Sequence, residues 1–370
     1  MRKFLNMALS LLLWTVPVIE MDARQVVRNV IYMIGDGMGL SHMSMFEIEG
    51  GYSDHAFKRA QSISLISTMS ANNRVTDSAA AGTALSSGYK TNNAMIGMRP
   101  DSTTTVSMME MAVNEGFSTG IVVTSELYHA TPATFYAHQP KRKMYEEISE
   151  DMLNSSIDVL LGGGDLILRK PFKNYTYLDH FAQKGYEVVH TMETLEGIGS
   201  GKVIGTFAKK SMPKAFRRGD YLPRAMTSAL RILEANSADK AKGFMLMVEG
   251  SKIDGAAQSN DVAATLAEVV DFEKAVAIAF DYADAHPGTL VVVVGDHETG
   301  GLSAVSGNSD FTAAESGIEY KFSTKAHSAV RVPAYFYGTG ADGFKAMMDN
   351  TELAFAIMKA AGLKKEEVNP

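Results

Sequence analysis

The chain has 370 residues, of which 46% are hydrophobic and 21% are charged, as in an ordinary globular protein long enough for a large buried core. Its formal net charge at pH 7 is −7, which gives no reason to expect a nucleic-acid partner. The sequence contains no cysteine, so disulfides and zinc–thiolate sites are excluded, and any metal must be held by oxygen and imidazole ligands.

The N-terminus has the pattern of a secretory signal. Arg2 and Lys3 precede an apolar run from Leu5 to Ile19. A basic start followed by a short apolar stretch is typical of export signals, and the run is shorter than a comfortable membrane span. Residues 1–23 are therefore predicted to be a signal peptide, although small residues do not mark its cleavage point sharply; an uncleaved anchor is the alternative. We expect a periplasmic or secreted protein with no membrane span after signal removal.

Short apolar runs alternate with helical patterns along the rest of the chain. Strands are predicted at Val30–Ile34, Ser62–Thr68, Gly120–Thr124, Val159–Leu161, Phe244–Val248, Leu290–Val294 and Val332–Tyr337. Helices are predicted at Asp101–Glu115, Tyr221–Ala235 and Val262–Ala285. This alternation favours an α/β fold with a large central, mostly parallel sheet and helices on both faces. Residues 24–370 are expected to form one domain, with 169–218 as a peripheral insertion.

Three of the buried strands are followed closely by an acidic residue next to glycine. These acids are Asp36, Glu249 and Asp296, and His297 comes directly after the last of them. In a parallel sheet the carboxyl ends of the strands meet at one edge, where ligands bind. A single Gly-Asp pair is usually a turn, but three carboxylates at one edge repel one another unless protons or cations intervene. The pattern therefore predicts a metal site, to which Asp254 adds a fourth acid.

Ser78 follows Asp77 at the start of an alanine-rich helical pattern. A serine hydroxyl at a helix N-terminus lies near unpaired N–H groups and the positive end of the helix dipole, which suits contact with a phosphate anion. Asp and Ser are also ordinary N-cap residues, so the local sequence alone favours a cap. The metal-binding acids favour a nucleophile, and both roles are compatible if either residue begins the helix while the Ser78 hydroxyl faces the metals.

Several motifs in sequence order resemble those of alkaline phosphatases, from Asn29 to about Gly340. They are Tyr32–Gly39 (YMIGDGMG), Val75–Ala80 (VTDSAA), His129–Pro132 (HATP), Val248–Asp254 (VEGSKID), Gly295–Gly301 (GDHETGG) and His327. The resemblance implies a three-layer α/β sandwich that hydrolyses phosphate monoesters through a phosphoserine. It also implies two zinc sites and one magnesium site, and it makes a homodimer a candidate assembly.

The resemblance assigns roles to individual positions. Ser78 would be the nucleophile, and Arg142 would grip the phosphate, although the run Lys141–Lys143 by itself reads as a solvated surface. The implied metal ligands are Asp36, Asp296 and His297 for one zinc, Asp254 and His327 for the second zinc, and Asp36, Thr131 and Glu249 for magnesium.

Two positions depart from the family pattern. The family usually supplies a histidine four residues after the aspartate that Asp254 matches, and this chain has Gln258 there. A glutamine carbonyl is a weaker zinc ligand than imidazole, so we expect reduced zinc occupancy at the second site. Family members carry Asp or His at the position of His129. We expect His129 to orient the magnesium ligands through water, and direct coordination as an extra ligand is the alternative.

Hydrolysis of phosphate monoesters is the function that the sequence favours. The alternatives are a weakly active or phosphate-binding relative with an impaired second zinc site, and a phosphodiesterase of the same superfamily. A sulfatase is disfavoured because Ser78 is followed by Ala79–Gly82, which lacks the Cys/Ser-x-Pro-x-Arg frame.

Overall fold

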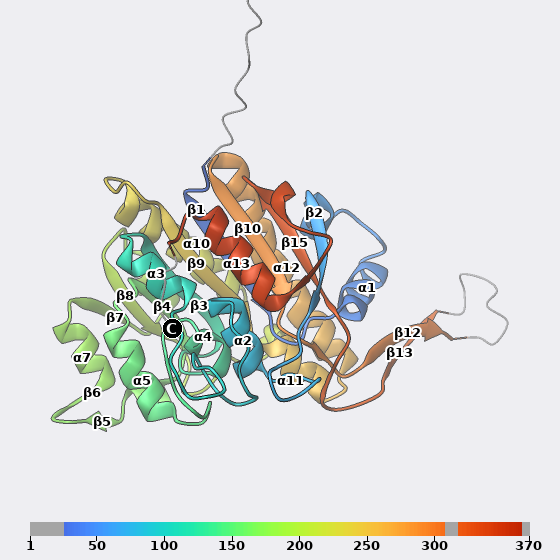
Figure 1. Cartoon of the computed structure of the whole chain (residues 1–370), viewed down its shortest axis with the longest axis horizontal. Coiled ribbons are helices and arrows are strands. Elements are labelled where there is room, and N and C mark those ends of the chain that lie inside the picture. Colours follow the sequence, from blue (N-terminus) through green and yellow to red (C-terminus); the bar gives the residue numbers. More distant parts are fainter. Residues whose placement is uncertain (1–25, 308–316, 365–370) are drawn as a thin grey trace, which may run out of the picture.

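The computed structural model describes residues 26–307 and 317–364, and the predicted signal peptide over 1–23 lies outside them. A ten-stranded sheet forms the centre of the molecule (Figure 1). In spatial order its strands are β16 (Met347–Asp349), β2 (Ser62–Ser67), β15 (Val332–Gly338), β10 (Thr289–Gly295), β1 (Asn29–Gly35), β9 (Phe244–Gly250), β3 (Ser118–Glu126), β4 (Val159–Gly163), β8 (Lys202–Thr206) and β7 (Tyr186–Val189). Among these ten strands only β15 runs antiparallel to its neighbours, so the predicted mostly parallel sheet is confirmed.

Two hydrophobic cores lie on opposite faces of this sheet. In β1, the side chains of Val30, Tyr32 and Ile34 enter one core, and those of Ile31 and Met33 enter the other, because successive side chains of a strand alternate between faces. The first core includes side chains from α2 (Ser78–Ser87), α3 (Met108–Asn114), α4 (Ala130–Ala133), α5 (Tyr145–Asn154), α7 (Tyr177–Gln183) and α13 (Asn350–Ala360). The second includes side chains from α1 (Leu40–Glu49), α8 (Met192–Glu196), α10 (Tyr221–Ser237) and α12 (Val262–Ala285). Helices on both faces confirm the three-layer α/β architecture (Figure 1).

Shorter elements complete the described part of the chain. They are α6 (Asp165–Leu168), β5 (Pro171–Phe172), β6 (Tyr175–Thr176), α9 (Ala215–Arg218), α11 (Lys252–Gln258), β11 (Glu298–Thr299), β12 (Leu302–Ser306), β13 (Ile318–Phe322), β14 (His327–Ser328) and 3-10 turns at Ala56–Arg59 and Ala341–Gly343. β11 pairs with β14, which places Thr299 opposite His327. Residues 169–218 contribute β8, which pairs with β4, and β7, which forms the outer edge of the sheet.

The helix predicted over Asp101–Glu115 is wrong in its first half, since α3 begins only at Met108. Ser107 caps this helix by accepting a hydrogen bond from the Glu110 N–H (3.2 Å), and the Glu110 carboxylate accepts one from the Ser107 N–H (2.8 Å). This reciprocal pair fixes the start of the helix. Asp101 instead accepts a hydrogen bond from the Thr103 N–H in a preceding turn.

Within 26–307 and 317–364, no helix is both long and apolar enough to cross a bilayer.

Candidate active site

The acids that follow the central strands lie side by side at the carboxyl edge of the sheet. β1 lies between β10 and β9, and its last residue pairs with the last residue of each. Asp36 and Asp296 therefore leave the sheet at the same level, and Glu249 is the second-last residue of β9. All three side chains are buried. The sequence pattern thus concentrates three carboxylates in one water-poor region.

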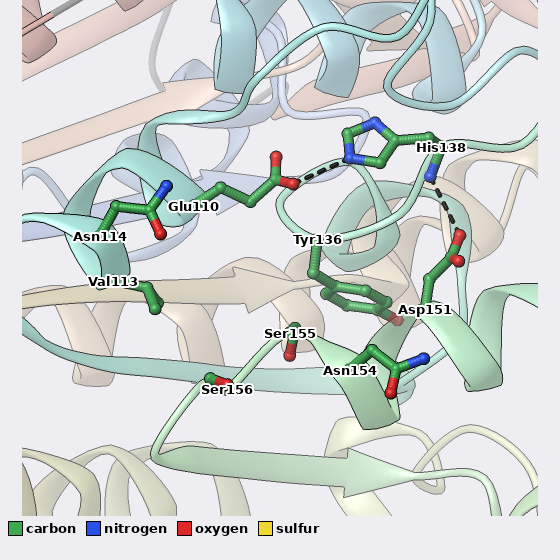
Figure 2. Close-up of a pocket in the computed structure, with 9 residues that line it drawn as sticks. All are labelled: Glu110, Val113, Asn114, Tyr136, His138, Asp151, Asn154, Ser155 and Ser156. Carbon is green, nitrogen blue, oxygen red and sulfur yellow. Dashed lines mark hydrogen bonds and ion pairs between the residues drawn. The ribbon is translucent and has the colours of Figure 1, made fainter.

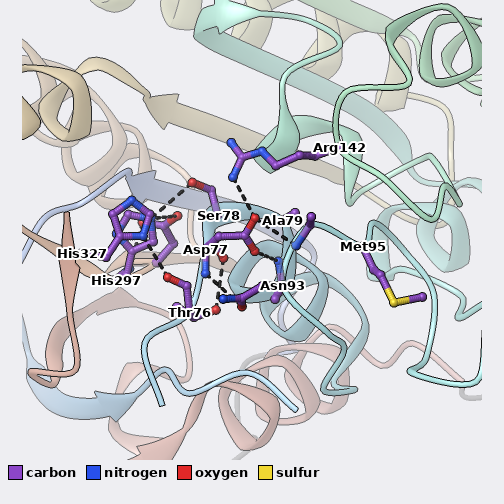
Figure 3. Close-up of polar contacts among 12 residues, drawn as sticks. Thr76, Asp77, Ser78, Ala79, Asn93, Met95, Arg142, His297 and His327 are labelled. Atoms are coloured by element: carbon purple, nitrogen blue, oxygen red, sulfur yellow. Dashed lines mark hydrogen bonds and ion pairs between the residues drawn. The ribbon is translucent and has the colours of Figure 1, made fainter. Parts of the chain in front are cut away.

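Helix α2 brings Ser78 to this edge. Asp77 is its N-cap residue, because the Asp77 carboxylate accepts a hydrogen bond from the Ala80 N–H at 3.0 Å. Capping by Asp77 leaves the Ser78 hydroxyl available for other contacts. Ser78 Oγ lies 3.2 Å from Nε2 of His297 (Figure 3). Asp77 is therefore the cap, and Ser78 stays the candidate nucleophile.

The candidate metal-ligating side chains form three overlapping groups, and within each group one possible ligand atom per residue lies within 4.8 Å of the others. The groups are Asp36 with Asp296 and His297, Asp254 with His297 and His327, and Asp36 with His129 and Glu249. Asp36 and His297 each belong to two groups. This sharing resembles a cluster of adjacent cation sites more than a set of separate ones.

Several buried polar atoms at this edge have no hydrogen-bond partner. They are both carboxylate oxygens of Asp36, Oδ2 of Asp296, Oε1 of Glu249, Oγ1 of Thr131 and Nδ1 of His129. Buried polar atoms are almost always paired, because leaving them unpaired costs free energy. Oxygen and imidazole donors together suit zinc and magnesium. The donor set therefore fits bound divalent cations.

Burial and mutual repulsion shift the pKa values of these groups. Burial raises the pKa of Glu249 and of Asp296 to about 7, and burial followed by the charge of Asp296 raises the pKa of Asp36 well above its usual range. Burial also lowers the pKa of His297 to about 3 and that of His129 to about 4. The imidazoles of His297 and His129 are therefore neutral near pH 7, and the three carboxyls hold protons to a higher pH than free carboxyls do.

Asp254 and His327 are held in place by neighbouring groups. His327 donates from Nδ1 to the carbonyl of Thr76 (2.8 Å), which directs Nε2 to within 3.3 Å of an Asp254 oxygen. The Thr299 hydroxyl donates to the same carboxylate at 2.6 Å. Burial alone would raise the pKa of Asp254, but the hydrogen bond from His327 and the nearby imidazoles lower it below its usual range. Such outer contacts commonly orient metal ligands.

Glycine is required where the backbone passes between these groups. Gly37 has φ +80°, and its N–H donates to an Asp296 oxygen at 2.9 Å. A Cβ at this position would lie 2.8 Å from the Thr299 hydroxyl and 2.9 Å from the Asp254 backbone. A larger residue would therefore push the two parts of the site apart.

Gln258 lies on α11, one turn after Asp254. Its carboxamide nitrogen is 2.8 Å from an Asp254 oxygen and 3.4 Å from Nε2 of His327. The carboxamide thus lies beside Asp254 and His327, where the family pattern predicts a third ligand of the second zinc. Only its carbonyl oxygen could bind a cation there.

Arg142 reaches the site from the chain between α4 and α5. Its guanidinium donates to Oδ2 of Asp77 at 3.0 Å, and its side chain is 23% exposed. Figure 3 shows Arg142, Asp77 and Ser78 grouped at the start of α2. A guanidinium at this edge can offer parallel N–H groups to two oxygens of a phosphate.

One residue of the candidate metal groups was not among the predicted ligands, and one contact of the site was not predicted. His129 belongs to the third group, and its position two residues before Thr131 in the motif His129–Pro132 was the available signal. The bond between Asp77 and Arg142 had no sequence signal, because 65 positions separate the two residues.

Comparison with known proteins agrees with this geometry. The family model for alkaline phosphatase matches residues 27–319. Alkaline phosphatase 4 of Bacillus subtilis (strain 168) is 36% identical over 291 residues; the match covers 75% of this chain but only 62% of that protein, less than two thirds of its length. Alkaline phosphatase 3 of the same organism is 34% identical over 355 residues, covering 92% of this chain and 74% of that protein.

A solved structure matches the whole architecture. Alkaline phosphatase from the Antarctic bacterium TAB5 has a TM-score of 0.84 and 34% identity, covering 92% of this chain and 100% of that one. A variant of the TAB5 enzyme has Mg bound in its M3 site. The family match over most of the chain, with relatives above 30% identity, shows that the chain belongs to the alkaline phosphatase family, a family of phosphatase enzymes.

Proposed function

We propose that the protein hydrolyses phosphate monoesters to an alcohol and inorganic phosphate through a phosphoserine at Ser78. The observation that carries the proposal is the Ser78 hydroxyl, which is released from capping by Asp77 and lies 3.2 Å from His297. The group of Asp36, Asp296 and His297 adjoins it. Membership of the alkaline phosphatase family supports monoester hydrolysis.

The metal ligands that we propose are the side chains with unpaired buried atoms and their neighbours. They are Asp36, Asp296 and His297 for one zinc, Asp254 and His327 with Gln258 for a second, and Asp36, Thr131 and Glu249, with His129 beside them, for magnesium. Divalent cations at these places supply positive charge that favours a serine alkoxide and offsets the charge of the phosphate. The Mg-bound variant of the TAB5 enzyme supports magnesium as one of the ions.

The chain's own residues supply attack, orientation and charge. Ser78 Oγ attacks phosphorus and the alcohol leaves; water then attacks the phosphoserine and releases phosphate, with Oγ as the leaving oxygen. Arg142 donates to two phosphate oxygens and so orients the phosphorus. The N–H groups and dipole at the start of α2 stabilise negative charge on the serine phosphate. Two displacements at one phosphorus predict retention of configuration.

Gln258 favours a second candidate function. With a carboxamide beside Asp254 and His327 in place of an imidazole, the second zinc is expected to bind more weakly. The protein would then be a weakly active or phosphate-binding relative, with one zinc filled and little turnover. Zinc content measured beside turnover separates the two candidates.

The substrate class is inferred from Arg142, and the location of the protein from its predicted signal peptide. A guanidinium that holds two unesterified phosphate oxygens favours monoesters over diesters. Small phosphate monoesters outside the cytoplasm are therefore the proposed substrates, with export by the predicted signal peptide. The resemblance to the family supports a homodimer as the assembly to test.

The Ser78→Ala variant tests the proposal. Hydrolysis of a chromogenic phosphate monoester at alkaline pH should fall by more than about 10³-fold, as expected for loss of a nucleophile. Zinc and magnesium content should stay unchanged, because the other proposed ligands remain when the Ser78 hydroxyl is removed. Ser87→Ala, at the other end of α2, is the matched control and should keep wild-type turnover. An undiminished rate in Ser78→Ala would exclude the phosphoserine mechanism.

A further inference from the structure

Residues 92–97 form a loop that lies between the helix of the nucleophile and the segment that carries Arg142. We refer to these residues as the spacer loop. On the α2 side, the Ala94 N–H donates to Oδ2 of Asp77 at 3.0 Å, and the Gly97 N–H donates to the hydroxyl of Thr83 at 3.0 Å. The loop is therefore bound to the first two turns of α2.

The opposite side of the spacer loop holds the arginine segment. Ile96 and Gln139 exchange two backbone hydrogen bonds, each 2.9 Å long, and the Arg142 N–H donates to the carbonyl of Ala94 at 2.7 Å. Asp77 Oδ2 accepts from both the Ala94 N–H and the Arg142 guanidinium. The loop thus sets the distance between Ser78 and the guanidinium.

His138 fixes the far end of this arrangement (Figure 2). Its Nδ1 lies 2.8 Å from the carbonyl of Gly97, and its Nε2 lies 2.8 Å from the carboxylate of Glu110. Both partners are acceptors, so the doubly protonated imidazolium fits best. The backbone N–H of His138 donates to Asp151 at 3.1 Å. Burial alone would lower the pKa of His138, but the hydrogen bond and charge of Glu110 raise it.

Gly97 shows how closely the two segments approach. Its φ is +59°, and a Cβ there would lie 2.1 Å from the carbonyl oxygen of Ala137 and 2.7 Å from Nδ1 of His138. Only glycine permits this contact. The spacer loop and the arginine segment are therefore in direct backbone contact at the position that His138 holds.

We propose that His138 is a positioning residue, which, held between Glu110 and Gly97, fixes the placement of Arg142 relative to Ser78 and thereby strengthens phosphate binding. It acts through Arg142 and does not touch the phosphate. The inference rests on the proposed function of Arg142 as a phosphate ligand. His138 also borders a pocket of about 330 Å³, lined by Glu110, Tyr136 and Asp151 among others, so its truncation opens space that water can enter without repacking the core.

A double-mutant cycle between His138 and Arg142 tests the inference, with binding of inorganic phosphate to the metal-loaded protein measured by calorimetry. His138→Ala and His138→Gln should each raise the phosphate Kd, by about 10-fold for alanine, since the charged hydrogen bonds that hold the segment are lost. In the Arg142→Ala background, the same changes should have almost no effect. Turnover should show a raised KM with kcat much less affected.

His180→Ala is the matched control, because His180 is also a partly buried ring that bonds a backbone carbonyl, that of Phe172. It should leave the phosphate Kd unchanged, and thermal unfolding shows whether each variant folds. Equal effects of the His138 changes with and without Arg142, or wild-type Kd in both single variants, would overturn the inference. If the cycle shows this coupling but the wild-type protein hydrolyses no monoester, the proposed function alone is wrong. If the wild-type protein binds no phosphate, both the proposed function and this inference are wrong.

Discussion

Asp77 and Ser78 show how two adjacent residues divide two roles at a helix start. The carboxylate of Asp77 accepts from the Ala80 N–H and from Arg142, so it both caps α2 and holds the arginine. Ser78 then presents its hydroxyl to His297. The proposed nucleophile, Ser78, therefore needs no cap contact of its own, because Asp77 supplies it.

Gln258 gives the prediction at the residue scale. In Gln258→His, an imidazole replaces a carboxamide beside Asp254 and His327, so zinc affinity at the second site should rise by at least about 10-fold. Zinc titration by calorimetry and the zinc retained after dialysis measure this rise. Ser259→His places the new histidine one residue further on, at an exposed position, and should retain no more zinc than wild type. Equal zinc retention in all three proteins would contradict the interpretation of Gln258.

Residues next to strand ends were predictable, whereas pairwise contacts were not. Asp36, Glu249 and Asp296 could be brought together from sequence because parallel strands share one carboxyl edge. The bonds from Asp77 to Arg142 and from His138 to Glu110 depend on how loops fold back over the sheet. Neither hydrophobic periodicity nor a sequence motif indicates how these loops fold back.

Helix α2 gives the prediction at the scale of elements. All ten of its residues are buried, so water cannot replace a lost hydrogen bond to the N–H groups at its start. Asp77→Ala removes the acceptor of the Ala80 N–H, and the free energy of unfolding should fall by roughly 1–2 kcal/mol. Asp77→Asn keeps a capping oxygen and should lose less. Urea unfolding of the metal-free proteins measures both values; equal losses in the two variants would show that capping is not the cause.

Element boundaries were predictable where the pattern was long and its ends were marked. Helix α12 begins at Val262 and ends at Ala285, as predicted, and Asp261 caps it by accepting from the Ala264 N–H. The start of α3 was predicted too early because the serine and threonine residues before it are also possible caps. The reciprocal hydrogen bonds between Ser107 and Glu110 place the start at Met108. Local hydrogen bonds, which propensity does not capture, decided the start of that helix.

At the scale of the whole molecule, the buried acids make stability depend on pH and on metal. The folded pKa values of Glu249 and Asp296, about 7, lie above those of unfolded carboxyls, so their stabilising effect is complete at low pH and is lost as the pH rises through about 7. The lowered pKa values of His297 and His129 act oppositely: their stabilising effect is present above about pH 6.5 and is lost on acidification. Between about pH 6.5 and 8 the histidine contribution is therefore constant, and only the carboxyl contribution changes with pH.

The metal-free protein should consequently lose stability from about pH 6.5 to 8, most steeply below the folded pKa of about 7 and little near pH 8, with a slope of at most roughly 1.4 kcal/mol per pH unit for each carboxyl. The zinc- and magnesium-loaded protein should show no such loss, because the cations replace the protons. Urea unfolding with a chelator and with added metal measures the two curves. A metal-free protein that gains stability across this range would contradict the assignment of the buried acids.

The layered architecture was predictable because repeated strand–helix–strand patterns require crossovers that place helices on both faces. The order of the ten strands was not, since the pairing of β2 with β15 and β16 joins segments far apart in the chain. The spacer loop could not be foreseen for the same reason. Its hydrogen bonds go to several other parts of the chain, among them α2, the segment of Arg142, and Asn72 and Val75 before α2.

Capture of the covalent intermediate tests the central claim most directly. The metal-loaded protein is mixed with a phosphate monoester, quenched in acid and digested, and the peptide that contains Ser78 is analysed by mass spectrometry. We predict one phosphoryl group on Ser78 in the wild-type protein and none in Ser78→Ala, with Ser87 unmodified in both. Sustained monoester turnover without any phosphoryl group on Ser78 would contradict the account.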